Sequence, residues 1–197
     1  MEIFPFIDNV IRLRSKRGIL FMKQILYGIK YIINHQIFNK NTPLICGLVV
    51  TNKCNLQCRH CKIASRGVKN ISFEEIISAI DSFYNEGGRT LYIQGGEPFI
   101  WHDGKYDLDD IVDYSHKIGF FTTIIYTNGT IPIKTSADTV FISIDGLQKT
   151  HDFLRGKTFN RIIKNIRESK HPSLYINYTI NNYNKDEIQD FCEYTNG

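Results

Sequence analysis

Several features are scarce in this chain of 197 residues, and their scarcity narrows the classes of protein it can belong to. Proline occurs only five times, against 11 Tyr and 13 Phe, which argues against extensive disorder. Lys23 and Lys30 interrupt the longest apolar runs, which fall far short of the roughly 18 residues needed to cross a bilayer. The first residues lack the basic segment and apolar run of a signal peptide. We therefore expect a globular, cytoplasmic protein.

Excess positive charge is absent from most of the chain. Residues 1–43 hold seven Lys or Arg and two acidic residues, a net charge of +5. The rest of the chain sums to −1, although the whole carries +4. A body without a basic surface predicts no nucleic-acid partner and leaves a local role for the N-terminal arm.

Paired cysteines are also missing. The chain has five cysteines, an odd number, and three of them lie within eight residues, at Cys54, Cys58 and Cys61. A secreted disulfide framework would spread its cysteines in pairs, whereas this crowding is typical of a metal site in a reducing compartment. We expect the two outlying cysteines, Cys46 and Cys192, to be small core residues.

The hydrophobic pattern predicts one helical arm followed by alternating strands and helices. Residues 6–36 read as an amphipathic helix whose apolar stripe includes Ile19, Met22 and Ile29, and residues 39–43 read as a linker. Strands are expected at 44–50, 91–94, 120–126, 139–144 and 174–180, with helices starting near 73, 107, 158 and 184. This alternation predicts an α/β fold with a parallel sheet, either a barrel or an open curved sheet.

Residues suited to ligand binding follow the ends of these predicted strands. They form the cysteine loop, Gly95-Gly96-Glu97-Pro98, Thr127-Asn128-Gly129, Ser143-Ile144-Asp145-Gly146 and Asn181-Asn182. Ligands bind at the carboxyl ends of strands in parallel α/β folds, so these segments predict one site on one rim. We expect Trp101 and His102 to lie on an ordinary surface loop just beyond.

The cysteine spacing allows two kinds of metal site. Three thiolates separated by four and three residues can hold three irons of a cubane cluster, which leaves the fourth iron open to another ligand. The alternative is zinc, completed by a histidine or a distant cysteine. Zinc sites usually show a second pair of ligands, which is missing here, and His60 lies awkwardly between Cys58 and Cys61.

The sequence TNKCNLQCRHC resembles the CxxxCxxC loop of the radical S-adenosylmethionine (SAM) superfamily, with His60 at the aromatic position before the last cysteine. The resemblance continues through GGEP, TNG and SIDG to His151-Asp152 and Arg155-Gly156, over roughly residues 44–182. It implies a partial TIM barrel that holds a 4Fe–4S cluster and SAM. It also implies an external electron donor such as flavodoxin or ferredoxin.

Cofactor contacts are expected where these motifs fall. The resemblance implies that Glu97, after the close-approach glycines Gly95 and Gly96, accepts bonds from the ammonium group of SAM. The remaining candidates for cofactor contact are His60, Thr127, Ser143, Asp145 and Asn177. Asp145 could instead hold its own loop as an Asx turn. Arg155 could bind a carboxylate of the cofactor or substrate, or form a salt bridge with Asp152.

Two departures bear on the activity. The family core has six βα units and we count five, so the core at 44–197 is expected to lack its last unit. The basic arm at 1–43 could lie on an anionic membrane surface through residues 6–36, or pack its apolar face against the core.

We hypothesise an enzyme that cleaves SAM reductively to a 5′-deoxyadenosyl radical, which abstracts hydrogen from an unknown substrate, either a lipid or a peptide. The alternative is a non-catalytic iron–sulfur or cofactor-binding module that acts with a partner.

Overall fold

The structure is a computed structural model that describes residues 4–63, 67 and 70–196. The chain divides into two compact units, Met1–Leu44 and Ile45–Gly197. Helix α1 (Phe4–Gln36) makes up most of the first unit, where the sequence predicted a helix over 6–36. No helix among the described residues is long and apolar enough to cross a bilayer.

Large apolar side chains are exposed along one face of α1. Phe21, Leu26 and Ile32 are each about 60% exposed, and Met22, Ile25, Ile29 and Ile33 are exposed as well. At 100° per residue these seven positions fall within one broad stripe, while Lys23 and Lys30 lie at its border. The side chain of Ile19 lies outside the described residues.

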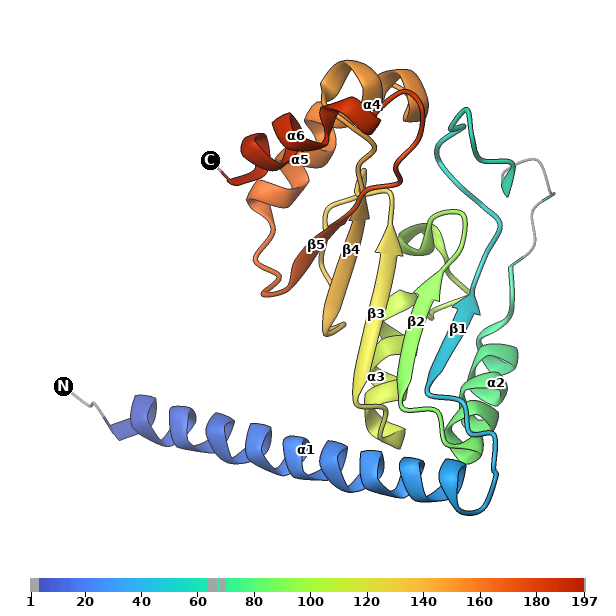
Figure 1. Cartoon of the computed structure of the whole chain (residues 1–197), viewed down its shortest axis with the longest axis vertical. Coiled ribbons are helices and arrows are strands. Elements are labelled where there is room, and N and C mark those ends of the chain that lie inside the picture. Colours follow the sequence, from blue (N-terminus) through green and yellow to red (C-terminus); the bar gives the residue numbers. More distant parts are fainter. Residues whose placement is uncertain (1–3, 64–66, 68–69, 197) are drawn as a thin grey trace. The chain divides into compact units, whose positions relative to one another are not determined.

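The second unit contains one sheet of five parallel strands in the order β1-β2-β3-β4-β5 (Figure 1). The strands are β1 (Ile45–Val49), β2 (Thr90–Gln94), β3 (Thr122–Thr127), β4 (Thr139–Ser143) and β5 (Leu174–Asn177). Sequential parallel strands, joined by helices at every connection except the one between β3 and β4, form the partial TIM barrel that the sequence predicted. All five carboxyl ends lie at the same end of the sheet.

Helices connect each pair of consecutive strands except β3 and β4, and a further helix follows β5; most of them begin where the sequence pattern placed them. They are α2 (Phe73–Glu86), α3 (Leu108–Ile118), α4 (Gln148–Arg155), α5 (Phe159–Glu168) and α6 (Ile188–Asn196), with 3₁₀ turns η2 (Pro98–Ile100) and η3 (Lys185–Glu187). Helix α4 was not predicted. It has eight residues, no side-chain cap and only His151 and Leu154 buried, which is too short a pattern to show helical periodicity.

Strong local signals set both ends of α2. Ser72 accepts a hydrogen bond from the Glu75 amide while Glu75 accepts one from the Ser72 amide, which is a capping box at the predicted start of this helix. Gly87 ends α2 with a φ of 110°, a left-handed conformation that favours glycine.

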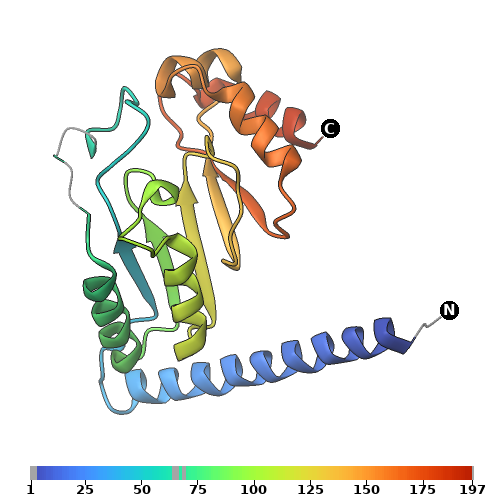
Figure 2. The same cartoon turned by 180° about the vertical axis from the view of Figure 1, so that it is seen from behind.

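The core lies between one face of the sheet and helices α2, α3 and α5. Figure 2 views the sheet from the side that α2 and α3 cover. Inward strand residues such as Leu91, Ile93 and Ile125 are fully buried, as are Ile80 of α2 and Ile162 of α5. Burying each such side chain contributes about 1.5–3 kcal/mol, so this layer holds the strand ends in a fixed array.

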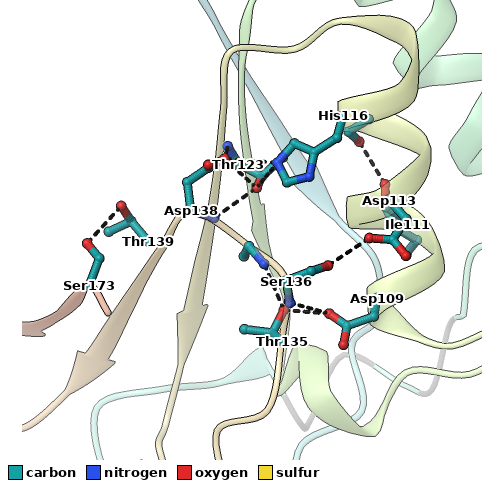
Figure 3. A network of polar contacts seen from close by, with 12 residues as sticks. Asp109, Ile111, Asp113, His116, Thr123, Thr135, Ser136, Asp138, Thr139 and Ser173 are labelled. Carbon is teal, nitrogen blue, oxygen red and sulfur yellow. Dashed lines mark hydrogen bonds and ion pairs between the residues drawn. The ribbon is translucent and has the colours of Figure 1, made fainter. Parts of the chain in front are cut away.

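A polar network ties α3 to the connection between β3 and β4 (Figure 3). The Thr135 hydroxyl donates to Asp109 over 2.5 Å, and the Ser136 hydroxyl donates to Asp113 over 2.8 Å. His116 Nε2 lies 2.9 Å from Asp138 Oδ2, which also accepts from the Thr123 amide. Asp138 precedes β4 and Thr123 lies near the start of β3, so this part of the network lies at the end of the sheet opposite the predicted site.

Two expectations for single residues were wrong. Trp101 is buried in the core and donates from its indole nitrogen to the Ile71 carbonyl over 3.0 Å, so it does not lie on a surface loop. Cys192 is exposed on α6, because the apolar face of that short helix is formed by Phe191 instead. Cys46 is buried in β1 as expected.

Candidate functional site

The three clustered cysteines line a cavity of about 460 Å³ at the carboxyl ends of the strands. This is the rim that the sequence predicted. Of the predicted site residues, Cys54, Cys58, Cys61, His60, Gly95, Gly96, Thr127, Ser143 and Asn177 line the cavity. Glu97 and Asp145 do not line it and are fully buried. Residues from all five strand ends therefore meet at one place, although 123 residues separate Cys54 from Asn177.

Helix α4 holds the middle of the cysteine loop. The Arg59 amide donates to the Leu154 carbonyl over 2.8 Å, and the Arg59 guanidinium lies 4.1 Å from the centre of the Phe153 ring. A cation over an aromatic ring contributes about 0.5–1 kcal/mol at an exposed position. Because Arg59 follows Cys58 directly, these contacts set where the loop turns towards Cys61.

The start of the cysteine loop is bonded to the end of β3. Asn128 Nδ2 donates to Asn55 Oδ1 over 2.8 Å, and Asn55 Nδ2 donates to Thr130 Oγ1 over 2.8 Å. The Thr130 amide in turn donates to Asn128 Oδ1 over 2.9 Å. Asn128 Nδ2 also lies 3.9 Å from Cys54 Sγ. Sequence reasoning marked the TNG segment but missed Asn55, whose only sequence signal was its position directly after a cysteine.

The thiols are partly shielded from solvent. Burial raises the pKa of both Cys54 and Cys58, and the Arg155 guanidinium partly offsets this rise at Cys58. A metal that binds these residues must displace their protons, so metal affinity falls as the pH falls. Among the described residues, no three His, Cys, Asp or Glu side chains converge as the ligands of a single metal ion do. One zinc ion would need its ligands within bonding distance of one point.

The two glycines of GGEP lie against the cysteine loop. A Cβ atom at Gly96 would lie 2.0 Å from the Lys53 carbonyl oxygen, and one at Gly95 would lie 2.6 Å from the Thr51 carbonyl oxygen. The Gly96 amide donates to Thr51 and the Glu97 amide donates to Lys53, each over 2.8 Å. Only glycine leaves room for this approach, so the cavity wall is bare backbone here.

Glu97 uses its carboxylate within the protein. It accepts from the Thr127 hydroxyl over 2.7 Å, from the Asn128 amide over 2.8 Å and from the Phe99 amide over 3.1 Å. Burial raises the pKa of Glu97, while these three donors act in the opposite direction. The carboxylate thereby joins the end of β2 to the end of β3.

Asp145 is the centre of a second buried group. Its Oδ2 accepts from Arg155 Nε over 2.6 Å and lies 3.8 Å from His60 Nε2, while Oδ1 accepts from the Thr179 amide over 3.2 Å. Arg155 pairs with Asp145 and not with Asp152, which caps α5 by accepting from the Thr158 and Phe159 amides. The sequence could not show this pairing, because Asp145 reaches Arg155 only when α4 folds back over β4.

His151 of α4 bonds to the loop that carries Asp145. Its Nδ1 accepts from the Asp145 amide over 3.3 Å, and its Nε2 lies 3.0 Å from the Thr158 hydroxyl. Burial lowers the pKa of His151 to about 4, so the ring is neutral near pH 7. These contacts fix the loop that carries Asp145.

A second cavity, of about 650 Å³, lies between the β3–β4 connection and the α5–β5 connection. Its lining includes Lys134, Glu168 and Lys170. It precedes the amino ends of β4 and β5, away from the rim where parallel α/β folds bind their ligands. The smaller cavity with the cysteines is therefore the candidate site.

Comparison with known proteins matches this arrangement to a family. The model of the Radical SAM superfamily matches residues 48–195. Fe-coproporphyrin III synthase of Methanosarcina barkeri is 26% identical over 166 residues, which cover 77% of this chain and 40% of that protein. The sporulation killing factor maturation protein SkfB of Bacillus subtilis is 30% identical over 168 residues, which cover 77% of this chain and 39% of that protein.

Solved structures share the fold. Streptococcus suis SuiB, in a crystal structure bound to the precursor peptide SuiA, superimposes with a TM-score of 0.62 at 21% identity. The match covers 87% of this chain and 42% of SuiB. The chain thus spans about two-fifths of the length of the curated relatives and solved structures it is compared with here.

Proposed function

Because the chain belongs to the radical SAM superfamily, we propose that Cys54, Cys58 and Cys61 hold a 4Fe–4S cluster that cleaves SAM reductively. The observation that carries this proposal is the cavity at the strand ends, where all three cysteines meet the glycine backbone of GGEP. Three thiolates suit three irons of a cubane and leave one iron for SAM. The lack of a second pair of ligand residues in the sequence favours a cluster over a single zinc ion.

When bound, the reduced cluster supplies the electron that splits SAM into methionine and a 5′-deoxyadenosyl radical, which abstracts hydrogen from the substrate. The chain's own part is to bind, orient and shield. The bare backbone at Gly95 and Gly96 gives the methionine end of SAM a close approach. Ser143, Thr127 and Asn177 offer hydroxyl and amide groups to the polar parts of SAM.

We propose that Glu97 and Asp145 position other residues of the site. Glu97 holds Thr127 and Asn128 in place, since its carboxylate accepts from both. Asp145 orients Arg155, whose Nε it accepts from. Arg155 lines the cavity, and the guanidinium nitrogens that Asp145 does not engage suit a carboxylate of SAM or substrate. His60 borders the cavity beside the cluster ligands. A direct bond from Glu97 to the ammonium group stays a prediction.

We propose a peptide as the substrate and a flavodoxin or ferredoxin as the electron donor. Support for a peptide comes from the similar fold of SuiB, whose structure holds a precursor peptide. Further support comes from the hydroxyl and amide groups of Gln94, Tyr126 and Asn177 along the cavity, which can pair with backbone amides of a bound segment.

Anaerobic reconstitution with iron and sulfide tests the proposed chemistry. We expect a broad visible absorbance from the cluster, and 5′-deoxyadenosine after addition of SAM and dithionite. Replacing Cys54, Cys58 or Cys61 with Ala should abolish both signals. Cys192→Ala is the matched control, because this cysteine is exposed on α6, and it should retain both.

Each outcome separates the candidate functions. One zinc per chain with no iron or sulfide would refute the cluster. A cluster that forms without any 5′-deoxyadenosine would instead favour the non-catalytic module that acts with a partner.

We also propose that residues 1–43 act as an arm separate from the core at 44–197, and that the arm contacts anionic membranes. Its support is the exposed apolar stripe of α1 bordered by lysines. Sedimentation with vesicles containing phosphatidylserine tests it. Ile29→Asp should weaken binding at least tenfold, whereas Gln24→Asp, on the opposite face of α1, should cause only a small loss. Equal losses, or no binding by the unaltered chain, would refute this role.

A further inference from the structure

A row of aromatic rings crosses the sheet face that points away from the core. Tyr126, Phe141 and Tyr175 are register partners on β3, β4 and β5. The Tyr126 and Phe141 rings stack with centres 4.9 Å apart, and the Phe141 and Tyr175 rings stack at 5.4 Å. Tyr92 of β2 extends the row, with its ring 5.8 Å from that of Tyr126. Four adjacent strands thus share one continuous aromatic surface, the aromatic row.

The aromatic row lies directly below the candidate site. Tyr126 itself lines the cavity that holds the cysteines. Ser143 and Asn177, which also line the cavity, follow Phe141 and Tyr175 by two residues on the same face of their strands. Two residues of a strand span about 6.6 Å, so the rings form the layer next to the rim. Any group that reaches the centre of the barrel from the rim meets these rings.

No charged residue lies on the face that contains the row. The five strands read ICGLV, TLYIQ, TTIIYT, TVFIS and LYIN, without a single Asp, Glu, Lys or Arg. The rim above it differs, because Lys62 and Arg155 border the cavity there. The site therefore has charged groups at its rim and none at its floor.

Four polar side chains on this face have no hydrogen-bond partner within the described part of the chain. The hydroxyls of Tyr92, Tyr126 and Tyr175 and the amide of Gln94 make no hydrogen bond to any described residue. None of these polar atoms is both buried from solvent and without a hydrogen-bond partner, so each is accessible to water or a ligand. Tyr175 is 55% exposed. Rings and free polar groups alternate along the face.

We propose that the aromatic row selects the substrate by contacting one uncharged, apolar side chain of a bound peptide segment. This inference rests on the proposed function and names the part of the peptide that enters the barrel. A charged side chain here would lose its water without gaining an opposite charge, which is unfavourable. An acyl chain would cover the tyrosine hydroxyls and the Gln94 amide without bonding them. A peptide backbone offers both donors and acceptors to those groups.

Four capped peptides, acetyl-Gly-X-Gly-amide with X as Phe, Leu, Glu or Lys, serve as probes. Their binding to the reconstituted protein with SAM is measured by anaerobic equilibrium dialysis. We expect the Phe and Leu peptides to bind at least tenfold more tightly than the Glu and Lys peptides. Equal affinities, or no binding of any of the four at 10 mM, would overturn the inference. If dodecanamide bound more tightly than the Phe peptide, the face would be assigned to an acyl chain, and the inference of a bound peptide would be overturned.

A matched pair of variants locates the effect. Tyr175→Lys should weaken binding of the Phe peptide at least fivefold. It should also make the Glu peptide bind more tightly than the Lys peptide. Thr122→Lys places the same charge on the same face four residues before Tyr126, about 13 Å below it and about 6.6 Å below the level of Tyr92, and should leave all four affinities unchanged. Equal effects of the two variants would contradict a role for the row.

The two proposals can fail separately. The unaltered protein and Thr122→Lys should both form the cluster and the 5′-deoxyadenosine that arises without substrate, because Thr122 does not line the cavity. If those signals persist while the peptides bind alike, only the inference about the row fails. If the unaltered protein forms no cluster and no 5′-deoxyadenosine, the proposed function fails, and the inference that rests on it fails with it.

Discussion

Asn128 Nδ2 donates to Asn55 Oδ1 over 2.8 Å and so joins the end of β3 to the cysteine loop. The same Asn128 accepts the Thr130 amide and hydroxyl, so one side chain fixes two segments that lie 73 residues apart in sequence. The loop otherwise has few buried apolar side chains to hold it, which makes this bond important for the position of Cys54.

Replacing Asn128 with Ala should destabilise the loop and weaken its hold on a cluster. Loss of these bonds should lower the free energy of unfolding by about 1–3 kcal/mol. Iron should also leave the reconstituted protein faster in the presence of a chelator, as followed by visible absorbance. Asn85→Ala, at an exposed position of α2, is the control and should change neither quantity. Equal rates of iron loss in both variants would show that Asn128 does not hold the loop.

Gly96→Ala should be more damaging than an alanine elsewhere. The added Cβ would lie 2.0 Å from the Lys53 carbonyl oxygen, so the cysteine loop must move. We expect a loss of stability of about 1–3 kcal/mol and little or no cluster after reconstitution. Gly28→Ala is the control, because nothing lies within 4 Å of a Cβ there and alanine favours a helix. Normal iron content in Gly96→Ala would show that the loop can shift without losing its ligands.

The buried ion pair predicts a non-additive double variant. Asp145 and Arg155 side chains are 1% and 12% exposed, so removing one charge leaves the other without a partner. Arg155→Met should cost about 3–5 kcal/mol in urea unfolding. Adding Asp145→Asn should restore part of that loss, because it removes the stranded carboxylate. If the two changes were simply additive, the pair would not interact as the 2.6 Å distance indicates.

His151 predicts a loss of stability in acid. Its pKa is lowered from 6.5 to about 4 by burial, so above pH 6.5 the ring is neutral in both the folded and the unfolded chain. As the pH falls from 6.5 towards 4, the unfolded chain binds a proton that the folded chain refuses. Stability should fall by about 3 kcal/mol over this range. His151→Gln should flatten that part of the urea-unfolding profile, while His102→Gln, at an exposed position, should leave it unchanged.

His116 predicts the opposite trend at higher pH. Its pKa is raised chiefly by its hydrogen bond to Asp138, so the folded chain binds the proton more tightly than the unfolded chain. The stabilisation is complete below pH 6.5 and is lost as the pH rises through the raised pKa. The effect is small because both side chains are at least one-third exposed. The profile of His116→Gln should lack this decline between pH 6.5 and 8; an unchanged slope would mean that the pair adds nothing.

Patterns of local origin were readable from the sequence. The capping box at Ser72 and Glu75, the strand runs and the glycine stops depend on near neighbours, and the structure has them close to the expected positions. The spacing of Cys54, Cys58 and Cys61 is also local. Because parallel strands align their carboxyl ends, the same reasoning brought Ser143 and Asn177 to one cavity.

Partners distant in sequence could not be read in the same way. The sequence could not show that the Glu97 carboxylate accepts three donors from the protein. Arg155 had two acidic candidates nearby, and only the path of α4 decides between Asp145 and Asp152. Nothing in the sequence around Asn55, apart from its position directly after Cys54, marks it as a residue that holds the loop. Such pairings depend on how elements pack, and a single sequence carries no direct signal of that.

The strand order has a consequence for how the interior of the barrel is enclosed. Strands β2, β3 and β4 each pair on both sides, whereas β1 and β5 each pair on one side only among the described residues. Any additional strand, from whatever source, can therefore join this sheet only beside β1 or beside β5. Tyr175 and Asn177 lie on β5, next to one of these two free edges. A strand added there would wall off the aromatic row from solvent, so that completing the barrel and confining the substrate would be the same event.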